Sequence, residues 1–334
     1  MTPRRSTPIT DLRLNRRSLM AVTAGGVAVA TLGRGATVHA QDKPEVIVGS
    51  KDFTEQIIIS EMTALMLEEA GYGVERQLNL GGSGIVHEAL VSGEIDVYTE
   101  YTGTALLVTL GLELPAADAE STPMASPTAD ASPVAGGGLA DTVYQIVATE
   151  YASQFNLVWL DPLGFNNTYT LAVRADTASE LGLTKISDLV GKEGDLTFGA
   201  TTEFVTRPDG LPGVSAAYGL SFGDEVGMDS GLVYGALDSE DVDVISAFAT
   251  DGRIPQLGLV LLEDDLGFFP PYFAAPVVKQ ELLDEDPAVR DVLNQLAGKI
   301  DNATMAGLNA QVDVDKIEAI DVARTYLQGQ GLVS

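Results

Sequence analysis

Cysteine is absent from this chain of 334 residues, and histidine occurs only at His39 and His87. Without cysteine the chain can form no disulfide bond, thiol nucleophile or zinc-cysteine site, and it cannot carry the acylated cysteine that anchors a lipoprotein. Two histidines are too few for a histidine metal cluster, and His39 lies in the N-terminal segment described below. His87, next to Glu88 in a helical stretch, is interpreted as a surface or capping residue. We therefore expect no catalytic residue, no metal and no cofactor.

Basic residues are scarce as well. The chain has 19 lysines and arginines against 48 aspartates and glutamates, which gives a net charge of -29. A polyanion of this size is repelled by phosphate backbones and by anionic lipids, so nucleic acid is not an expected partner. In so acidic a chain, neighbouring acids such as Asp264 and Asp265 carry little information about general acid-base chemistry. The negative charge suits salty surroundings, and it equally keeps an exported protein soluble.

The first 41 residues differ in charge from the rest and predict a twin-arginine signal peptide. Residues 15–20 read N-R-R-S-L-M, an apolar run follows at 19–32, and small residues end at Ala40, after which we expect cleavage. The apolar run is too short for an ordinary membrane span. The protein is therefore expected outside the cytoplasm, exported by the twin-arginine route. An uncleaved N-terminal anchor, which would leave it membrane-associated, is the alternative.

The chain after the leader alternates strands with helices, which predicts an α/β fold with parallel sheets. Thr54 is a plausible N-cap for the first helix, and a glycine loop at 81–84 precedes the second. That loop could bind an anion, but a tight turn between strand and helix fits it better. Ligands bind beyond the carboxyl ends of parallel strands, which places Ser50 and Lys51 at a cleft. The first strands are expected at 45–49, 74–79 and 95–98.

The length of the chain favours two lobes. We expect lobe 1 from residues 44–165 and 268–334, and lobe 2 from residues 166–267. The second crossing, at 268–272, contains two prolines, and the residues after it are expected to be mainly helical. Residues 114–139 are rich in Ala, Ser, Thr, Pro and Gly, and they predict a disordered insertion in lobe 1. A glycosylated or wall-spanning tract is the alternative for that insertion.

One internal repeat is visible. Residues 89–97 read A-L-V-S-G-E-I-D-V and are echoed 147 positions later by A-L-D-S-E-D-V-D-V at 236–244. Continuing the alignment places Tyr101 opposite Phe248, so each unit presents an aromatic ring at the carboxyl end of its strand. The two rings could face each other across a cleft, or each could fill the core of its own lobe.

Aromatic residues make up only 6% of the chain, yet Tyr101, Tyr169, Phe248 and Tyr272 fall at predicted strand ends or crossings. Such rings can enclose a quaternary ammonium, whose charge is attracted to ring faces. Lys51 and Arg207, on other loops, could bind a carboxylate. Taken singly, each ring also fits a core position and each cation a solvated surface position.

Six motifs in a fixed order give the chain a close family resemblance. Between residues 45 and 332 the chain resembles the glycine betaine/choline/carnitine substrate-binding proteins of osmoprotectant ABC importers. The motifs are G-S-K-D-F-T-E-Q at 49–56, N-L-G-G at 79–82, E-Y-T-G-T at 100–104, D-P-L-G-F-N-N-T-Y at 161–169, R-P-D-G at 207–210 and T-D-G-R at 250–253.

The resemblance implies a type II periplasmic-binding-protein fold, with two αβα lobes joined by a two-segment hinge. It also implies a small quaternary-ammonium solute as ligand, and an ABC permease and ATPase complex as partners. A ligand sensor that reports to a receptor is an alternative, and an enzyme on the same lobe architecture, as in porphobilinogen deaminase, is a weaker one because that enzyme needs a cysteine. The implied ring cage consists of Tyr101, Tyr169, Phe248 and Tyr272. The implied carboxylate contacts are Lys51, Thr104 and Arg207. Asn167 is implied at the hinge side. Betaine-binding members of the family have tyrosine where this chain has Phe248.

Overall fold

The computed structural model describes residues 43–115 and 138–334. The expected signal peptide and most of the expected insertion at 114–139 lie outside these residues. At the end of that insertion, Leu139 is already the first residue of a helix, which corrects the expected boundary. Within the described ranges, no helix combines the length and the apolar character needed to cross a membrane.

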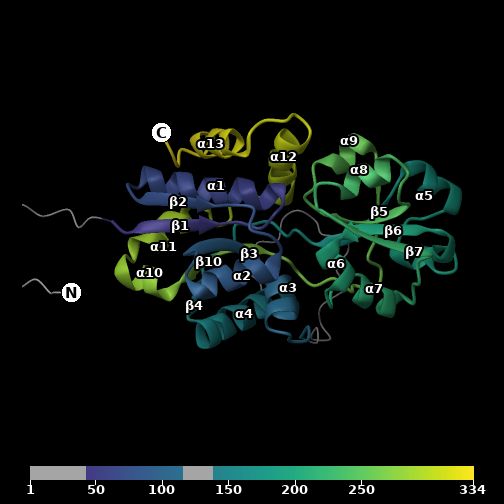
Figure 1. The fold of residues 1–334 in the computed structure, drawn as a ribbon, viewed down its shortest axis with the longest axis horizontal. Helices are drawn as coiled ribbons and strands as arrows, with labels where there is room; N and C mark the ends of the chain where they lie inside the picture. The colour runs from purple at the N-terminus through teal and green to yellow at the C-terminus, as the bar shows by residue number, and fades with distance from the viewer. Residues whose placement is uncertain (1–42, 116–137) are drawn as a thin grey trace, which may run out of the picture. The chain divides into compact units, whose positions relative to one another are not determined.

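The described chain forms two five-stranded sheets with the same plan (Figure 1). In each sheet the first three strands in the order pair in parallel, and the fourth strand is antiparallel to both of its neighbours. The first sheet has the order β2-β1-β3-β10-β4, with β1 Glu45–Gly49, β2 Gly73–Gln77, β3 Val97–Tyr101, β4 Leu157–Trp159 and β10 Ala274–Lys279. The second has the order β7-β6-β8-β5-β9, with β5 Tyr169–Val173, β6 Thr197–Thr201, β7 Asp224–Met228, β8 Val244–Phe248 and β9 Val260–Leu262.

Helices cover both faces of each sheet, which gives two αβα lobes as expected (Figure 1). The first lobe contains α1 Thr54–Glu69, α2 Ser83–Ser92, α3 Thr102–Thr104, a π-helical turn at Ala105–Thr109, α4 Leu139–Phe155, α10 Gln280–Glu285, α11 Ala288–Leu293, α12 Asn302–Asp313 and α13 Ala319–Gly329. The second contains α5 Ala175–Leu181, α6 Thr202–Thr206, α7 Leu211–Tyr218, α8 Val233–Asp238 and α9 Arg253–Leu257, with 3-10 turns at Ile186–Leu189 and Glu193–Asp195.

The chain crosses between the sheets twice, between β4 and β5 and again between β9 and β10. The two crossings lie side by side, because Asn166 and Phe273 form an antiparallel bridge. The two-segment hinge expected from the family resemblance is therefore present. The lobe boundaries given above from the sequence stay predictions.

The internal repeat corresponds to equivalent strands of the two sheets. β3 and β8 each hold the third place in the strand order, and their residues differ by 147 from the first residue to the last. Tyr101 and Phe248 are the final residues of these strands. Each strand pairs with an antiparallel strand that starts at the hinge, so both rings are placed beside the two crossings.

Several local predictions were wrong in detail. Phe53 holds the N-cap position of α1, and Thr54 is already helical, with its hydroxyl donating to Asp313 at 2.6 Å. The strand expected at 95–98 is β3, shifted to Val97–Tyr101, because the preceding turn takes up residues 93–96. The C-terminal part is mainly helical as expected, but it begins with β10, a strand that was not predicted and whose apolar run is interrupted by Pro276.

His87 is the clearest single error. It is only 9% exposed, and its ring lies 4.7 Å from the ring of Phe155 and 5.4 Å from that of Tyr151, in both cases edge-on. It is therefore a core residue of the first lobe. Its position on α2, which packs against the sheet, decides this burial, whereas the adjacent Glu88 is exposed.

Candidate functional site

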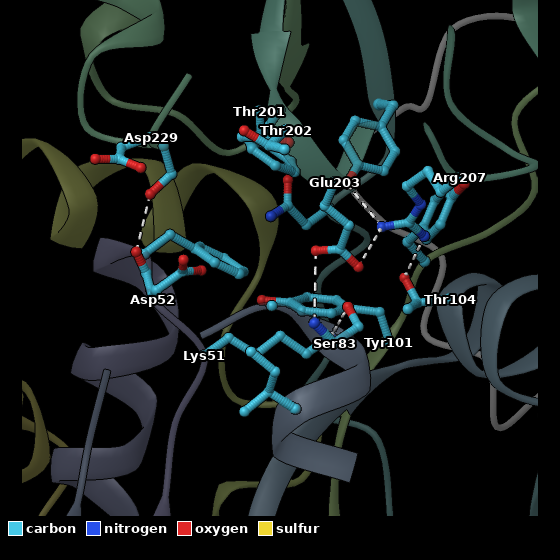
Figure 2. Close-up of a pocket in the computed structure, with 18 of the residues that line it drawn as sticks. Lys51, Asp52, Ser83, Tyr101, Thr104, Thr201, Thr202, Glu203, Arg207 and Asp229 are labelled. Atoms are coloured by element: carbon cyan, nitrogen blue, oxygen red, sulfur yellow. Dashed lines mark hydrogen bonds and ion pairs between the residues drawn. The ribbon is translucent and has the colours of Figure 1, made fainter. Parts of the chain in front are cut away.

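A pocket of about 330 Å³ lies where the two lobes meet (Figure 2). Its walls come from the carboxyl ends of β1, β3, β6 and β8, from the start of β5, and from the second crossing. All eight residues expected at the site from the sequence line it. The further lining residues are Asp52, Phe53, Gly82, Ser83, Ile85, Thr201, Thr202, Glu203, Met228, Asp229 and Ser230.

The four expected rings meet in the pocket, and they come from both lobes. Tyr169 and Phe248 are directly opposed on β5 and β8, with ring centroids 4.8 Å apart. Tyr272 meets Tyr169 edge-on at 5.4 Å and an interplanar angle of 89°. Tyr101, Tyr169 and Tyr272 are almost fully buried, and burial raises the pKa of each hydroxyl, so each stays an uncharged phenol.

Phe53 is a fifth ring that the sequence reasoning missed. It lies between the two lobes, 6.2 Å from Tyr101 and 5.7 Å from Phe248, and it is nearly parallel to Phe248, with an angle of 6° between their planes. The available signal was its place in the motif at 49–56, two residues after Lys51. Phe53 and Lys51 lie on the same loop after β1, so both side chains can reach the cleft.

Lys51 is buried, and its ammonium is already paired. Its Nζ lies 2.5 Å from Glu100 Oε1 and donates to Ser83 Oγ at 3.0 Å. Glu100 also accepts hydrogen bonds from the Tyr101 amide and from the Tyr98 hydroxyl. This network fixes Lys51 at the wall of the pocket, 5.2 Å from the Tyr101 ring centroid, so it is not a solvated surface charge.

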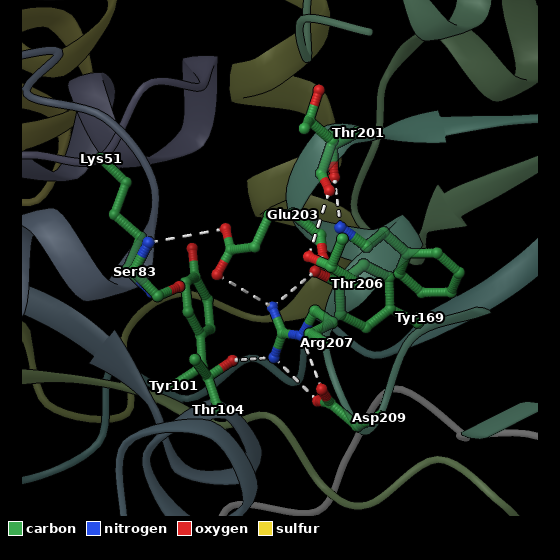
Figure 3. A network of polar contacts seen from close by, with 12 residues as sticks. Lys51, Ser83, Tyr101, Thr104, Tyr169, Thr201, Glu203, Thr206, Arg207 and Asp209 are labelled. Atoms are coloured by element: carbon green, nitrogen blue, oxygen red, sulfur yellow. Dashed lines mark hydrogen bonds and ion pairs between the residues drawn. The ribbon is translucent and has the colours of Figure 1, made fainter. Parts of the chain in front are cut away.

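Arg207 joins the two lobes (Figure 3). Its guanidinium forms a two-pronged pair with Asp209, at 2.5 and 2.7 Å, and donates to the Tyr169 hydroxyl at 3.0 Å. It also donates to Thr104 Oγ1 of the first lobe at 3.0 Å. Burial alone would lower the pKa of Arg207, but Tyr169 and Asp209 raise it well above its usual value, so the cation is permanent.

The motif at 207–210 is required by this geometry. A side chain at Gly210 would place its Cβ 2.0 Å from the carbonyl oxygen of Phe204, which no rearrangement of a side chain could relieve. The buried carboxylate of Asp209 accepts from Arg207 and also from the Tyr272 hydroxyl, at 2.5 Å. One aspartate therefore positions both a cation and a cage ring.

Three acids on the pocket wall were not foreseen. Glu203 lies between the lobes, with one oxygen 3.5 Å from the Ser83 amide nitrogen and the other 3.6 Å from Arg207 Nη1 (Figure 2). Asp52 and Asp229 line the opposite part of the pocket, where Ser230 donates to the Asp52 carbonyl at 2.9 Å. Because Lys51 and Arg207 already face Glu100 and Asp209, these acids leave the pocket negatively charged overall, which favours a cationic group in a ligand.

Asn167 lies in the first crossing between the lobes. This agrees with its expected place at the hinge side. Its amide nitrogen donates to Glu55 at 2.8 Å, and its side-chain oxygen has no hydrogen-bond partner among the residues that the structure describes. Within the same residues, no group of three or more His, Cys, Asp or Glu side chains is placed to hold a metal ion.

Comparison with known proteins agrees with this geometry. The model of the family described as the substrate binding domain of ABC-type glycine betaine transport systems matches residues 44–329. A carnitine transport binding protein of Listeria monocytogenes is 34% identical over 291 residues, covering 86% of this chain and 87% of that protein. A glycine-betaine-binding protein of Pseudomonas aeruginosa is also 34% identical, over 297 residues, with 86% and 88% covered.

Two further likenesses complete the comparison. An ergothioneine transport permease/ergothioneine binding protein of Helicobacter pylori is 33% identical over 293 residues, and the chain spans about half of that relative, 48% of its length. A crystal structure described as a glycine betaine/carnitine/choline ABC transporter superposes with a TM-score of 0.64 at 32% identity, covering 86% of this chain and 99% of that one.

Proposed function

Because the chain belongs to the family of substrate-binding domains of ABC-type glycine betaine transport systems, we propose that it captures glycine betaine or a related quaternary-ammonium solute for delivery to a membrane permease. Choline, carnitine and proline betaine share the methylated ammonium group and belong to the same proposal. The protein acts outside the cytoplasm after export by the twin-arginine route, and the permease works with an ATPase.

The observation that carries this proposal is one pocket that combines aromatic ring faces with two buried cations. A methylated ammonium cannot donate strong hydrogen bonds, but its charge is attracted to ring faces, with about 0.5 to 2 kcal/mol gained for each contact. The rings of Tyr101, Tyr169, Phe248 and Tyr272 offer these faces from both lobes, and Phe53 adds a fifth. The acids of the pocket favour the same cation.

The carboxylate of a betaine would bind to the remaining donors of the two cations. An ammonium has three N–H groups, and two of those of Lys51 have partners among the described residues. A guanidinium has five, and Arg207 uses four in its hydrogen bonds, which leaves one on Nη1 facing Glu203 at 3.6 Å. One donor from each cation would suit the two oxygens of a carboxylate, with Thr104 beside them.

Binding would close the two lobes around the solute. The contacts between the lobes, from Arg207 to Thr104 and from Ser230 to Asp52, lie at the edges of the pocket. A solute that touches rings of both lobes stabilises the closed arrangement more than an open one, and this difference drives closure. A solute that touched one lobe alone would leave the equilibrium unchanged.

Isothermal titration calorimetry tests the proposal with the purified protein. We expect binding of glycine betaine, and of at least one of choline, carnitine and proline betaine. Glycine is the matched control, because it has the same carboxylate but no methyl groups, and it should not bind measurably. A protein that bound none of the methylated compounds, or bound glycine as tightly as glycine betaine, would contradict the proposal.

A further inference from the structure

A buried carboxylate lies behind the pocket, outside its lining. Glu55 is the second residue of α1 and is 2% exposed. Its Oε1 accepts hydrogen bonds from the Tyr101 hydroxyl at 2.7 Å and from the Asn167 amide at 2.8 Å. Its Oε2 accepts from the Thr250 hydroxyl and from the Asn309 amide, the latter at 3.1 Å. Both oxygens therefore have the two donors that an ionised carboxylate can accept.

The four donors come from four separate parts of the chain. Tyr101 ends β3 of the first lobe, Thr250 follows β8 of the second, Asn167 lies in the first crossing, and Asn309 lies on α12. α12 also touches the second lobe directly, since a Cβ at Gly252 would be 2.5 Å from the Ala310 nitrogen. Glu55 thus connects a cage ring, both lobes and the hinge.

Glu55 forms no ion pair with any residue of the described ranges. The charged and titratable groups on the elements around it are paired elsewhere: Lys51 with Glu100, and Arg253 with Asp251 and Asp313. His87 interacts electrostatically with Glu100, and Asp52 lines the pocket. What favours the ionised form is the set of four donors together with the N-terminal end of the sixteen-residue helix α1, whose dipole attracts negative charge.

Burial works against that ionised form. It raises the pKa of Glu55 above its ordinary value of 4.5, while the hydrogen bonds from Thr250, Tyr101, Asn309 and Asn167 lower it. Burial outweighs these hydrogen bonds, so the ionised carboxylate lacks the attraction that a neighbouring cation would supply. A positive charge placed on the far side of the Tyr101 ring would supply the missing attraction.

We propose that Glu55 is the positioning residue and the counter-charge of the cage: it holds Tyr101 by the hydroxyl, and its negative charge strengthens the attraction of that ring for a bound quaternary ammonium. The inference rests on the proposed function. A phenol that donates to a carboxylate has a more electron-rich ring, which binds cations more strongly. Glu55 acts through Tyr101, since it does not line the pocket itself.

Ligand binding and the ionisation of Glu55 are coupled, and the direction of the effect on affinity follows from the charges. Cation binding favours ionised Glu55, so ligand affinity is full above the raised pKa of this carboxyl and falls as the pH is lowered through it. Within that window the protein releases protons when it binds the ligand. For each unit by which the ligand lowers the pKa of Glu55, affinity falls about tenfold at low pH.

The experiment compares wild type with Glu55→Gln by calorimetry of glycine betaine between about pH 5 and pH 8, in two buffers of different ionisation enthalpy. Glutamine keeps the shape of the side chain but removes the charge. We expect Glu55→Gln to bind about tenfold more weakly at neutral pH and to lose both the pH dependence and the proton release. Glu61→Gln is the matched control, a buried glutamate on the same helix paired with Arg76 at 2.8 Å, and should keep wild-type binding.

A second variant separates a role through Tyr101 from a general loss of structure. Tyr101→Phe keeps the ring but removes the hydroxyl, so Glu55→Gln should cost little more affinity in this background. Thermal unfolding is recorded for each variant. If Glu55→Gln lowers stability but leaves affinity and its pH profile unchanged, Glu55 only stabilises the fold and the inference is wrong. If wild type itself binds no methylated ammonium compound, the proposed function fails instead.

Discussion

At the scale of single residues, the sequence leaves open whether a ring lies in the core or in the pocket and whether a cation is exposed or buried, and the tertiary structure decides this. From the sequence, each ring of the proposed cage also fits a core position, and in the structure Tyr272 is 1% exposed and yet lines the pocket. Arg207 is likewise buried, and its charge is balanced by Asp209. Removing such a cation entirely would leave a buried carboxylate unpaired, so informative substitutions must keep the charge.

Arg207→Lys should weaken glycine betaine by about tenfold and choline much less. Lysine keeps the positive charge beside Asp209 but lacks the remaining Nη1 donor that is proposed to bind the carboxylate of betaine. Choline has no carboxylate and does not use the remaining donor. A loss of about 1.4 kcal/mol corresponds to a factor of ten, which calorimetry resolves.

Arg174→Lys is the matched control for that measurement. Arg174 donates to the carbonyls of Leu237 and Val242 and to Asp243 in the same lobe, away from the pocket. It should lower the unfolding temperature and leave both affinities unchanged. Equal losses for betaine and choline in Arg207→Lys would mean that Arg207 does not contact the carboxylate.

His87 predicts a pH dependence of stability. Burial lowers its pKa below the usual 6.5, and Glu100 and Glu88 offset this only in part. In the unfolded chain the imidazole gains its proton near pH 6.5, whereas in the folded chain it stays neutral to lower pH. Stability is therefore full above pH 6.5 and is lost as the pH falls from there towards the lowered pKa of the folded state.

Denaturant unfolding at a series of pH values measures this effect. His87→Phe, which keeps an aromatic ring against Tyr151 and Phe155, should flatten the profile between about pH 5 and pH 6.5. If the free energy of unfolding of the variant changes with pH as it does in wild type in that window, the pH dependence comes from other groups, first of all the acids of the cleft.

At the scale of secondary-structure elements, the site is made by strand ends. β3 and β8 end in rings at Tyr101 and Phe248, and β5 begins with Tyr169 at the same edge. The second crossing then delivers Tyr272 against the short helix α3. Gly103 of this helix packs on that ring, because a Cβ there would be 2.7 Å from two Tyr272 ring carbons and 3.0 Å from Pro270.

Gly103→Ala should therefore displace Tyr272, with a loss of about 1 to 3 kcal/mol in folding stability, the usual cost of an added methyl group at a tight contact, and it should lower the affinity for every methylated ammonium ligand. Betaine and choline should lose affinity equally, since the change affects the ring and not the carboxylate site. The measurement is calorimetry with both ligands.

Gly84→Ala controls for a general effect of replacing glycine. It lies on α2 beside the pocket wall, and nothing lies within 4 Å of an added Cβ there. This variant should bind as wild type does. Unchanged affinity in Gly103→Ala would show that Tyr272 can shift without loss, and would remove it from the cage.

At the scale of the whole molecule, charge is the dominant property. A net charge of -29 is spread over a chain with few cations, and several of these cations are used in buried pairs such as Lys51 with Glu100 and Arg207 with Asp209. Repulsion among the remaining surface acids opposes the compact state. Salt screens such exposed charges but hardly affects the buried pairs.

We therefore expect the melting temperature to rise when sodium chloride is increased from about 0.01 M to about 1 M, where the screening length falls from about 30 Å to about 3 Å. Each kcal/mol gained should appear as a rise of about 2 to 4 °C. The measurement is thermal unfolding followed by circular dichroism, with sucrose as an uncharged control. A melting temperature that stays flat or falls with salt would show that surface repulsion does not limit stability.

The sequence by itself determined the α/β character, the two-lobe plan and the repeat of 147 residues, because all of these rest on local periodicity and on short motifs in a fixed order. The alternation of strand and helix is a property of neighbouring residues. The strands β2 and β3 begin and end at other residues than predicted, and β10 was missed, because Pro276 interrupts its apolar run and its partners β3 and β4 lie more than a hundred residues away.

Only the tertiary structure decided which residues share the pocket and with what charge. Phe53, Glu203 and Asp229 reach it from three different elements, and no spacing in the sequence relates them. The same holds for Glu55, whose four donors lie between 46 and 254 residues away along the chain. Burial and hydrogen bonding depend on contacts across the two lobes, and such contacts exist only once the chain has folded.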